Sequence, residues 1–490
     1  MSTHRSRPSR RKIIGGIAAA GAVAAVTPFA GAFSAQAAAS GSYVIRYDKK
    51  RQQTILGLGF EIQSDSIGSN NNGLPKAVSA VPHDLTKSER TRFYQQMLKA
   101  GRSDRGFRYC RLAMGLYYRG LDDSRRHMRG RYPGQDELLA DMIKQAGIEG
   151  TSVEYWSPAP AFKSTDSYLG GRLASFARKD LDALGDAMVA DLDHLTGNGI
   201  PVSMWGLQNE PRHKIDRYSH CHYNADQYLA AFKAVAPKIR AKYPDVMIMA
   251  DSIDGWEEAI GRKLSKDPEA MSHIDAWTYH RIGNDSNEQM TRNFRSGAAG
   301  KPVFNNEFEY LDNKTSDRRC INTAQSIMNW MVFQDAPTWF WLHALKPIAN
   351  AEAAGYSLGF WRPPSDKDFS RFPDLKPGHW TWNPQNWNAV AGFVKYMPWD
   401  SVRYMVDESK RLSDQRIMAW KTPSDKQVFA ITNRSRTESF TYTVDTQTSA
   451  SFEGHRYGPK TNDQRIGSKQ GPKLTLTVPP LSIEFWVRSA

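Results

Sequence analysis

Eight short apolar runs, each followed by an interval long enough for a helix, occupy residues 55–345 of this 490-residue chain. The runs span residues 55–60, 107–114, 151–156, 202–208, 246–250, 274–279, 303–306 and 338–343. In the interval 179–196, leucine and methionine side chains recur at helical spacing. Eight strand–helix units over about 290 residues are typical of a (β/α)8 barrel. A doubly wound sheet fits less well, because no glycine-rich fingerprint follows the first run.

The end of the chain changes to short alternating strands separated by polar, turn-rich stretches. Such strands are expected at 427–432, 440–444, 474–478 and 483–487. We therefore predict a catalytic barrel over 55–400 and an all-β side domain, a β-sandwich, over 401–490. The segment 38–54 also alternates and is expected to add a strand to the side domain. The Pro-, Gly- and Trp-rich segment 350–386 should form an elaborated loop after the eighth strand.

Residues 1–37 have the three parts of an export signal: a basic head, an apolar run and a small-residue cleavage site. The head contains the motif Ser9-Arg10-Arg11-Lys12, which is similar to a twin-arginine motif and predicts bacterial export to the outside of the cell. An ordinary signal with a chance arginine pair is the alternative.

The formal net charge of +14 raises the question of nucleic-acid binding. Five basic residues would leave with the signal, and those that remain are not interleaved with stacking aromatic residues. No later stretch approaches the roughly 18–20 apolar residues that a membrane span needs. We therefore expect no nucleic-acid partner and no membrane partner after signal removal, and we expect a monomer.

The three cysteines do not have the paired spacing of a zinc site. Cys110 falls in a strand-like run and is expected to be a buried, inert side chain. Cys221 and Cys320 fall in polar, loop-like stretches, so a disulfide between them is an open alternative. We expect no cofactor and no metal.

Two glutamates end apolar runs, where a barrel of this kind gathers its functional residues. Glu210 ends the fourth run and Glu307 the seventh, so they should face one another across the mouth of the barrel. A facing pair of carboxyl groups is what glycoside hydrolysis requires, one as nucleophile and the other as acid/base. The alternative for each is a structural salt bridge.

Several motifs resemble retaining barrel glycosidases of clan A, and more narrowly glycoside hydrolase family 30, nearly from end to end. They are Gln53-Thr54-Ile55 with Gly57-Leu58-Gly59-Phe60, the segment 155–163, Gln208-Asn209-Glu210-Pro211, and the stretch 388–403. The resemblance implies a retaining hydrolase whose β domain is built from both chain ends. It also implies that Glu210 is the acid/base and Glu307 the nucleophile, with Glu309 as a rival nucleophile.

The resemblance assigns roles to four neighbours as well. Asn209 would bind the sugar 2-hydroxyl, and Arg111 would orient the nucleophile. Tyr279 and His280 would be donors near the nucleophile, with a core tyrosine and a satisfied histidine as the alternative. The chain departs from the family at Phe60 and Glu61, where small residues are usual, which indicates a remodelled subsite.

Tryptophans near strand ends are candidate platforms for a sugar ring, although each could equally be a core residue. Trp156 and Trp341 are the two that we favour among Trp156, Trp205, Trp339, Trp341 and Trp361.

Basic residues crowd the loops that follow the second, fourth and seventh runs, and these loops belong to the predicted catalytic face. They are Arg119, Arg125, Arg126, Arg129, Arg131, Arg212, His213, Lys214, Lys314, Arg318 and Arg319. Such a rim favours a substrate with carboxylates or sulfates, and a solvated basic surface is the alternative.

The sequence therefore predicts a secreted retaining O-glycosidase that acts on β-linked poly- or oligosaccharides, including cell-wall glycans with acidic groups. Two alternatives remain. One is a neighbouring clan A hydrolase, arabinofuranosidase-like or glucuronidase-like, and the other is a carbohydrate-binding protein on a catalytically dead barrel.

Overall fold

The computed structural model describes residues 39–48, 51–62, 85–102, 105–253, 259–280, 298–310, 316–348, 355, 357–363 and 366–489. The predicted export signal lies outside the described residues. Within this part of the chain, none of the helices has the length and hydropathy that crossing a bilayer would require.

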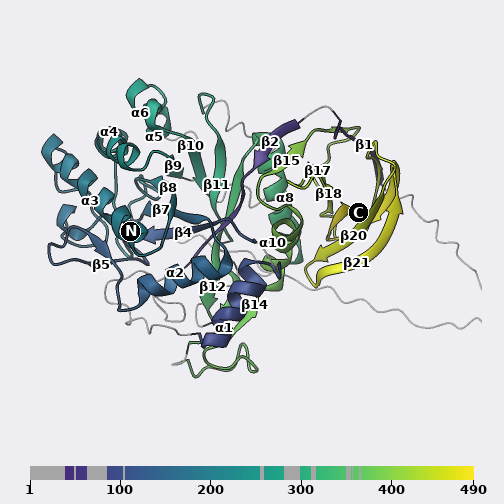
Figure 1. Cartoon of the computed structure of the whole chain (residues 1–490), viewed down its shortest axis with the longest axis horizontal. Helices are drawn as coiled ribbons and strands as arrows, with labels where there is room; N and C mark the ends of the chain where they lie inside the picture. Colours follow the sequence, from purple (N-terminus) through teal and green to yellow (C-terminus); the bar gives the residue numbers. More distant parts are fainter. Residues whose placement is uncertain are drawn as a thin grey trace, which may run out of the picture. The chain divides into compact units, whose positions relative to one another are not determined.

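Eight parallel strands close into a barrel (Figure 1). They are β3 (Gly57–Glu61), β4 (Tyr109–Met114), β7 (Gly150–Tyr155), β8 (Val202–Gly206), β9 (Met247–Ile253), β10 (Ala276–His280), β11 (Val303–Phe308) and β12 (Thr338–Pro347). β12 pairs in parallel with both β11 and β3, which closes the ring. Each predicted run overlaps one barrel strand, so the (β/α)8 prediction is confirmed.

Helices connect and surround the strands. They are α1 (Lys87–Arg92) with the π-helical turn η1 (Phe93–Leu98), α2 (Gln135–Ala146), α3 (Arg178–Gly197), α4 (Ala225–Lys242), α5 (Ala259–Leu264), α6 (Pro268–His273), α8 (Asp317–Gln334) and α10 (Pro384–Tyr396). α3 spans the helix predicted over 179–196, and its apolar stripe, from Leu181 to Leu195, is buried. α4 begins at a capping box in which Asn224 and Gln227 bond each other's backbone N–H groups.

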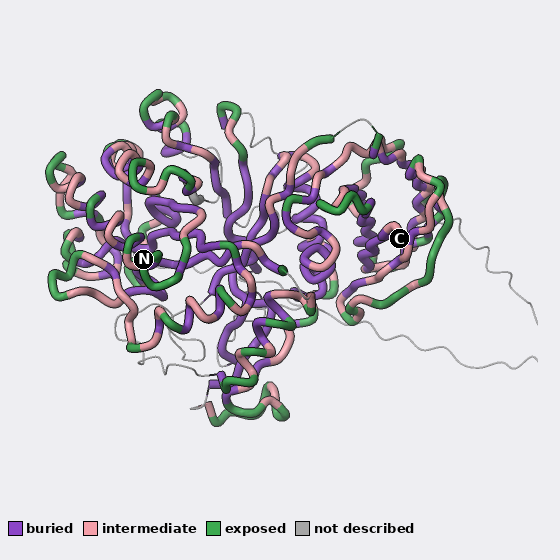
Figure 2. Tube along the Cα trace, in the orientation of Figure 1, coloured by how far each residue is buried: buried purple, intermediate pink, exposed green. Residues whose placement is uncertain are grey.

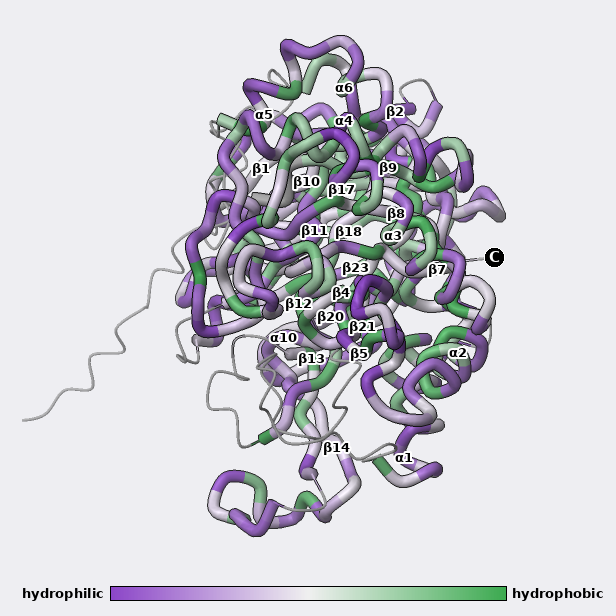
Figure 3. The backbone as a smooth tube through the Cα atoms, turned by 90° about the vertical axis from the view of Figure 1, so that its left-hand side faces the viewer, coloured by the Kyte–Doolittle hydropathy of each residue, from purple (hydrophilic) through white to green (hydrophobic). Residues whose placement is uncertain are grey.

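The strands carry the buried residues and the outer loops carry the polar ones. Figure 2 shows the barrel strands as buried, and Figure 3 shows that hydrophilic stretches dominate the outer loops. Inside the barrel, Gly59 of β3 packs against Phe340 of β12 so closely that a Cβ at residue 59 would lie 2.3 Å from the ring. Glycine is therefore a packing requirement at this position.

Two sheets in which most neighbouring strands are antiparallel form the side domain. The seven-stranded sheet consists of β2 (Arg51–Ile55), β15 (Ser401–Tyr404), β17 (Gln415–Lys421), β18 (Gln427–Asn433), β23 (Ser482–Arg488), β20 (Ser451–Gly458) and β21 (Thr461–Gln470). The four-stranded sheet consists of β16 (Val406–Glu408), β1 (Ala39–Ile45), β19 (Phe440–Asp445) and β22 (Lys473–Val478). Side chains of both sheets, such as Tyr43, Phe429 and Leu476, share one buried cluster.

Strands from the beginning of the chain complete both of these sheets. β1 pairs in parallel with β19 and antiparallel with β16, and β2 pairs antiparallel with β15. In Figure 1 the purple β1 accordingly lies among strands from the other end of the chain. The domain can therefore form only when residues that are more than 350 positions apart come together.

Two helices of the barrel, α8 and α10, contact the side domain. Gln325 of α8 donates to the Thr432 hydroxyl at 2.9 Å, and Asn388 of α10 donates to the Gly458 carbonyl at 2.8 Å. Gly392 of α10 faces Phe485 of β23, and a Cβ at residue 392 would lie 2.1 Å from that ring.

The described part of the predicted loop after the eighth strand contains two strands. β13 (Ser357–Trp361) pairs in parallel with the end of β12, and β14 (Trp380–Trp382) pairs antiparallel with β13.

The three cysteines are free and buried, so the alternative of a Cys221–Cys320 disulfide is not realised. Cys320 belongs to α8, and its assignment to a loop is wrong.

Candidate active site

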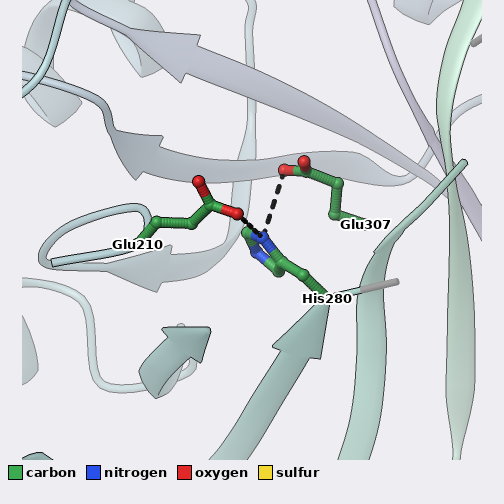
Figure 4. A group of neighbouring side chains, drawn as sticks. All are labelled: Glu210, His280 and Glu307. Carbon is green, nitrogen blue, oxygen red and sulfur yellow. Dashed lines mark hydrogen bonds and ion pairs between the residues drawn. The ribbon is translucent and has the colours of Figure 1, made fainter. Parts of the chain in front are cut away.

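The two predicted catalytic glutamates meet at the carboxyl ends of the strands. Glu307 lies near the end of β11, and Glu210 lies shortly after the end of β8. One carboxylate oxygen of each and a ring nitrogen of His280 all lie within 4.8 Å of one another (Figure 4). The Nδ1 atom of His280 is 3.0 Å from Oε1 of Glu210 and 3.6 Å from Oε2 of Glu307.

Glu210 is held in a fixed and unusual conformation. Its φ of 45° lies in the left-handed region. This conformation is unfavourable for any residue other than glycine, and residues that adopt it are common at functional sites. His280 contacts one carboxylate oxygen of Glu210, and Nδ1 of His213 lies 3.0 Å from the other. Two imidazoles therefore orient this carboxyl group from two sides.

A fully buried arginine organises the Glu307 side of the site. Arg111, in β4, donates from Nη1 to Glu307 and, at 3.1 Å, to Glu61, and it donates from Nε to Glu154 at 3.0 Å. Its Nη2 donates to Oδ1 of Asn209 at 2.7 Å. Burial alone would lower the pKa of Arg111, but the surrounding carboxylates raise it, so the guanidinium keeps its charge.

The aromatic face of Trp156 supports this guanidinium, which lies 4.4 Å above the ring. The residue is 5% exposed and packs with Leu116 and Tyr117. In the structure, Trp156 therefore positions Arg111 as well as bordering the site.

Glu61, at the end of β3, is the third carboxyl group around Arg111. Burial, together with the nearby Glu307 charge, raises the pKa of Glu61 to about 8 against the opposing effect of Arg111, so this group is protonated at neutral pH. Its Oε1 lies 3.3 Å from Nδ1 of His343 in β12. Burial and the charges of Lys346 and Arg111 hold the pKa of His343 well below its usual range, so the imidazole is neutral.

The remaining predicted site residues have different surroundings. Asn209 is buried and bonded to Arg111, next to Glu210. The ring of Tyr279 stacks on Trp330 of α8 with a centroid separation of 6.2 Å, because successive residues of a strand face opposite sides. Trp341 is fully buried beside Phe308 and Trp339, so it offers no exposed face to a sugar. Glu309 is also fully buried, and the carboxyl that Arg111 binds on β11 is that of Glu307.

Sequence reasoning missed Glu154 as a site residue and treated His213 only as part of a basic rim. A signal for Glu154 existed, since it is the one charged residue of the fully buried strand β7. Space for it comes from Gly206 of β8, where a Cβ would lie 3.2 Å from Oε1 of Glu154. His213 lies three residues after Glu210, and no spacing rule distinguishes it from its basic neighbours.

Several residues of the predicted basic rim have structural partners. Arg125 pairs with Asp166 at 3.0 Å, and Arg318 pairs with Asp414 of the side domain at 3.0 Å. Arg119 is buried, and Arg319 is buried with its guanidinium over the ring of Tyr310. Lys314 lies outside the described residues. Fewer of these basic side chains are therefore available to a substrate than their number suggests.

Glu210, His280 and Glu307 are also the group, among the described residues, whose oxygen and nitrogen atoms are close enough together to share a metal ion. Nδ1 of His280 already contacts both carboxylates, Glu210 at 3.0 Å and Glu307 at 3.6 Å.

Comparison with known proteins supports the fold. No family model and no curated protein matches the sequence. Among solved structures, the chain is similar to a glycoside hydrolase family 30 subfamily 8 xylanase from Clostridium acetobutylicum, with a TM-score of 0.67 and 15% identity over 92% of this chain and 100% of that one.

Two further structures match over a similar length. An endo-β1,6-glucanase has a TM-score of 0.66 and 14% identity, covering 91% of this chain and 94% of that one. A family 51 arabinofuranosidase from Xanthomonas axonopodis pv. citri has a TM-score of 0.60 and 10% identity, covering 92% and 100%. At these identities the likeness establishes a shared fold, a (β/α)8 barrel with a β side domain.

Proposed function

We propose that this protein is a retaining glycoside hydrolase that cleaves β-glycosidic bonds in a poly- or oligosaccharide. The observation that carries the proposal is the approach of Glu210 and Glu307 oxygens to within 4.8 Å at the carboxyl ends of β8 and β11. Retaining enzymes place their carboxyl groups about 5–5.5 Å apart, whereas inverting enzymes leave about 6.5–9.5 Å for a water molecule.

In the proposed reaction, a Glu307 oxygen attacks the anomeric carbon while Glu210 protonates the leaving oxygen. The bond to the leaving group breaks, and a glycosyl ester of Glu307 forms. Glu210 then accepts a proton from water, which attacks the anomeric carbon and releases Glu307. Arg111 binds and orients the Glu307 carboxylate, and the amide NH2 of Asn209 is the group that we assign to the sugar 2-hydroxyl.

Substitution of each glutamate tests these roles. Glu307→Ala should lower turnover by at least about 10³-fold, because no covalent intermediate can form. Glu210→Ala should also be inactive, but azide should restore part of its rate and yield a glycosyl azide, since azide needs no general base. Unchanged turnover of Glu307→Ala, or the same azide response in both variants, would reject the assignment.

The substrate is the least defined part of the proposal. The similar structures include a xylanase and an endo-β1,6-glucanase, which supports a polysaccharide substrate. A preference for acidic cell-wall glycans would draw on those loop arginines and lysines that have no structural role. A panel of defined polysaccharides, in neutral and uronic-acid-bearing versions, tests this preference, and equal rates on both versions would remove it.

An arabinofuranosidase-like activity is a second candidate, favoured by the likeness to the family 51 structure. Aryl α-L-arabinofuranoside and aryl β-glycosides distinguish the two candidates directly. A protein that binds glycans but hydrolyses none of these substrates would instead be a carbohydrate-binding barrel.

Dialysis against EDTA should leave the rate of glycoside hydrolysis unchanged, since no proposed step needs a metal ion.

We also propose that the protein is exported after folding, on the basis of the twin-arginine-like motif in residues 1–37. Replacement of Arg10 and Arg11 together by lysine should retain the protein inside the cell. Unimpaired export of that variant would favour the ordinary signal.

A further inference from the structure

Glu61 is a buried carboxyl group that the proposed mechanism does not use. It is 1% exposed and stands where the resemblance leads one to expect a small residue. Its Oε2 accepts from Nη1 of Arg111 at 3.1 Å, and the same nitrogen donates to Oε2 of Glu307. Glu61 and the nucleophile therefore share one donor atom.

We propose that Glu61 is a positioning residue for Glu307. While Glu61 is uncharged, Arg111 stays bound to Glu307; when Glu61 ionises, it draws Arg111 away from Glu307. This inference rests on the proposed function. An ionised Glu61 would bind Nη1 more strongly, because charge-assisted hydrogen bonds are shorter and stronger than neutral ones. It would also repel the Glu307 carboxylate.

The charged groups around Glu61 support an uncharged state near neutral pH. Among the described residues, Arg111 and the Cys110 thiol belong to β4, Glu154 to β7 and Glu307 to β11. His343 and Lys346 belong to β12, and Lys346 bonds the Tyr117 hydroxyl at 3.1 Å. Two basic side chains thus face three carboxyl groups, so protonation of one carboxyl would balance the cluster. The raised pKa of Glu61, about 8, is consistent with its being that one.

The predicted consequence is a fall in glycosylation rate above pH 8. A displaced nucleophile is costly, since an error of about 1 Å in a reacting group can lower a rate about 100-fold. Deprotonation of the acid/base would also lower the rate at alkaline pH, so its contribution must be removed. Glu210→Ala with an aryl glycoside that has a strongly activated leaving group achieves this, because departure then needs no acid.

The test compares kcat/KM between pH 6 and 9.5 for Glu210→Ala alone and combined with Glu61→Gln, each profile normalised to its own maximum. We expect at least a tenfold fall between pH 7.5 and 9.5 for Glu210→Ala and less than a twofold fall when Glu61→Gln is added. Glu61→Ala, a second uncharged variant, should give the same flat profile. Profiles that fall equally with and without Glu61 would overturn the proposal.

Asp191 offers a matched control, because it is another buried carboxyl whose pKa burial raises to about 8. It lies in α3 and accepts from the Met128 N–H and the Tyr155 hydroxyl, outside the Arg111 cluster. Asp191→Asn in the Glu210→Ala background should keep the alkaline fall. Loss of the fall in this control as well would attribute it to general stability and overturn the proposal.

A measurement of stability separates failure of this inference from failure of the proposed function. The pKa of Glu61 rises from 4.5 to about 8 on folding, so its stabilising effect is complete below pH 4.5 and is lost as pH rises through 8. The Tm of Glu61→Gln relative to the unsubstituted protein should therefore increase between pH 5 and 9. A pH-independent difference in Tm would overturn the inference even if the protein hydrolysed no glycoside.

Discussion

At the scale of single residues, the site depends on one guanidinium. Arg111 contacts three carboxyl groups and an amide within the barrel, and its side chain is fully buried. Burying such charges is tolerable only because each has a partner. The resemblance implied that Arg111 would orient Glu307. The larger cluster exists because pleat parity turns Glu61, Glu154 and Glu307 inward on different strands, which no local pattern reveals.

Removal of this charge should affect both stability and activity. Arg111→Leu leaves buried carboxyl groups without a counter-charge and should lower the free energy of unfolding by about 3–5 kcal/mol. Arg111→Lys keeps the charge but not the forked geometry, so it should lose less stability while still losing most activity. Urea unfolding and kcat measurements check these expectations. An active, fully stable Arg111→Leu protein would contradict the role given to this residue.

At the scale of elements, periodicity was sufficient for the barrel and insufficient for part of the side domain. All eight barrel strands and α3 carry strong apolar patterns and were predicted close to their true bounds. The hairpin of β20 and β21 was not predicted, because β21 is polar and exposed along most of its length. β13 and β14 were also missed, since the pairing of β13 with β12 and of β14 with β13 is decided by tertiary contact rather than by a local repeat.

The interior of the barrel also depends on the absence of a side chain at Gly59. Gly59→Ala should lower the free energy of unfolding by about 1–3 kcal/mol, because the added methyl would overlap the ring of Phe340. Gly197→Ala is the control, since a Cβ at this last residue of α3 meets nothing within 4 Å and should not destabilise. Denaturant unfolding of the two variants gives the comparison, and equal stabilities would refute the packing argument.

At the scale of the whole molecule, the barrel and the side domain share helices α8 and α10. The sequence predicted that both chain ends build the side domain, and the pairing of β1 with β19 shows where the first strand inserts. It did not predict how the domain attaches, because the attachment depends on side chains that only the folded chain brings together, from hydrogen bonds of Gln325 and Asn388 to apolar packing around Phe485.

Gly392 tests this attachment. Alanine is favoured over glycine within a helix by about 1 kcal/mol, so Gly392→Ala would stabilise an isolated α10. In the protein the new methyl would overlap the Phe485 ring, and we expect a net loss of about 1–3 kcal/mol. The double variant Gly392→Ala/Phe485→Leu should recover part of that loss. Calorimetry that showed a stabilised single variant would contradict this packing.

The central claim is that Glu307 attacks the sugar directly from a position within 4.8 Å of Glu210. The stereochemistry of the first-formed product tests it most directly. Proton NMR during hydrolysis of a β-linked substrate should show the β-anomer of the reducing sugar first, with the α-anomer appearing only by later mutarotation. Initial release of the α-anomer would mean inversion by a water molecule and would contradict the mechanism.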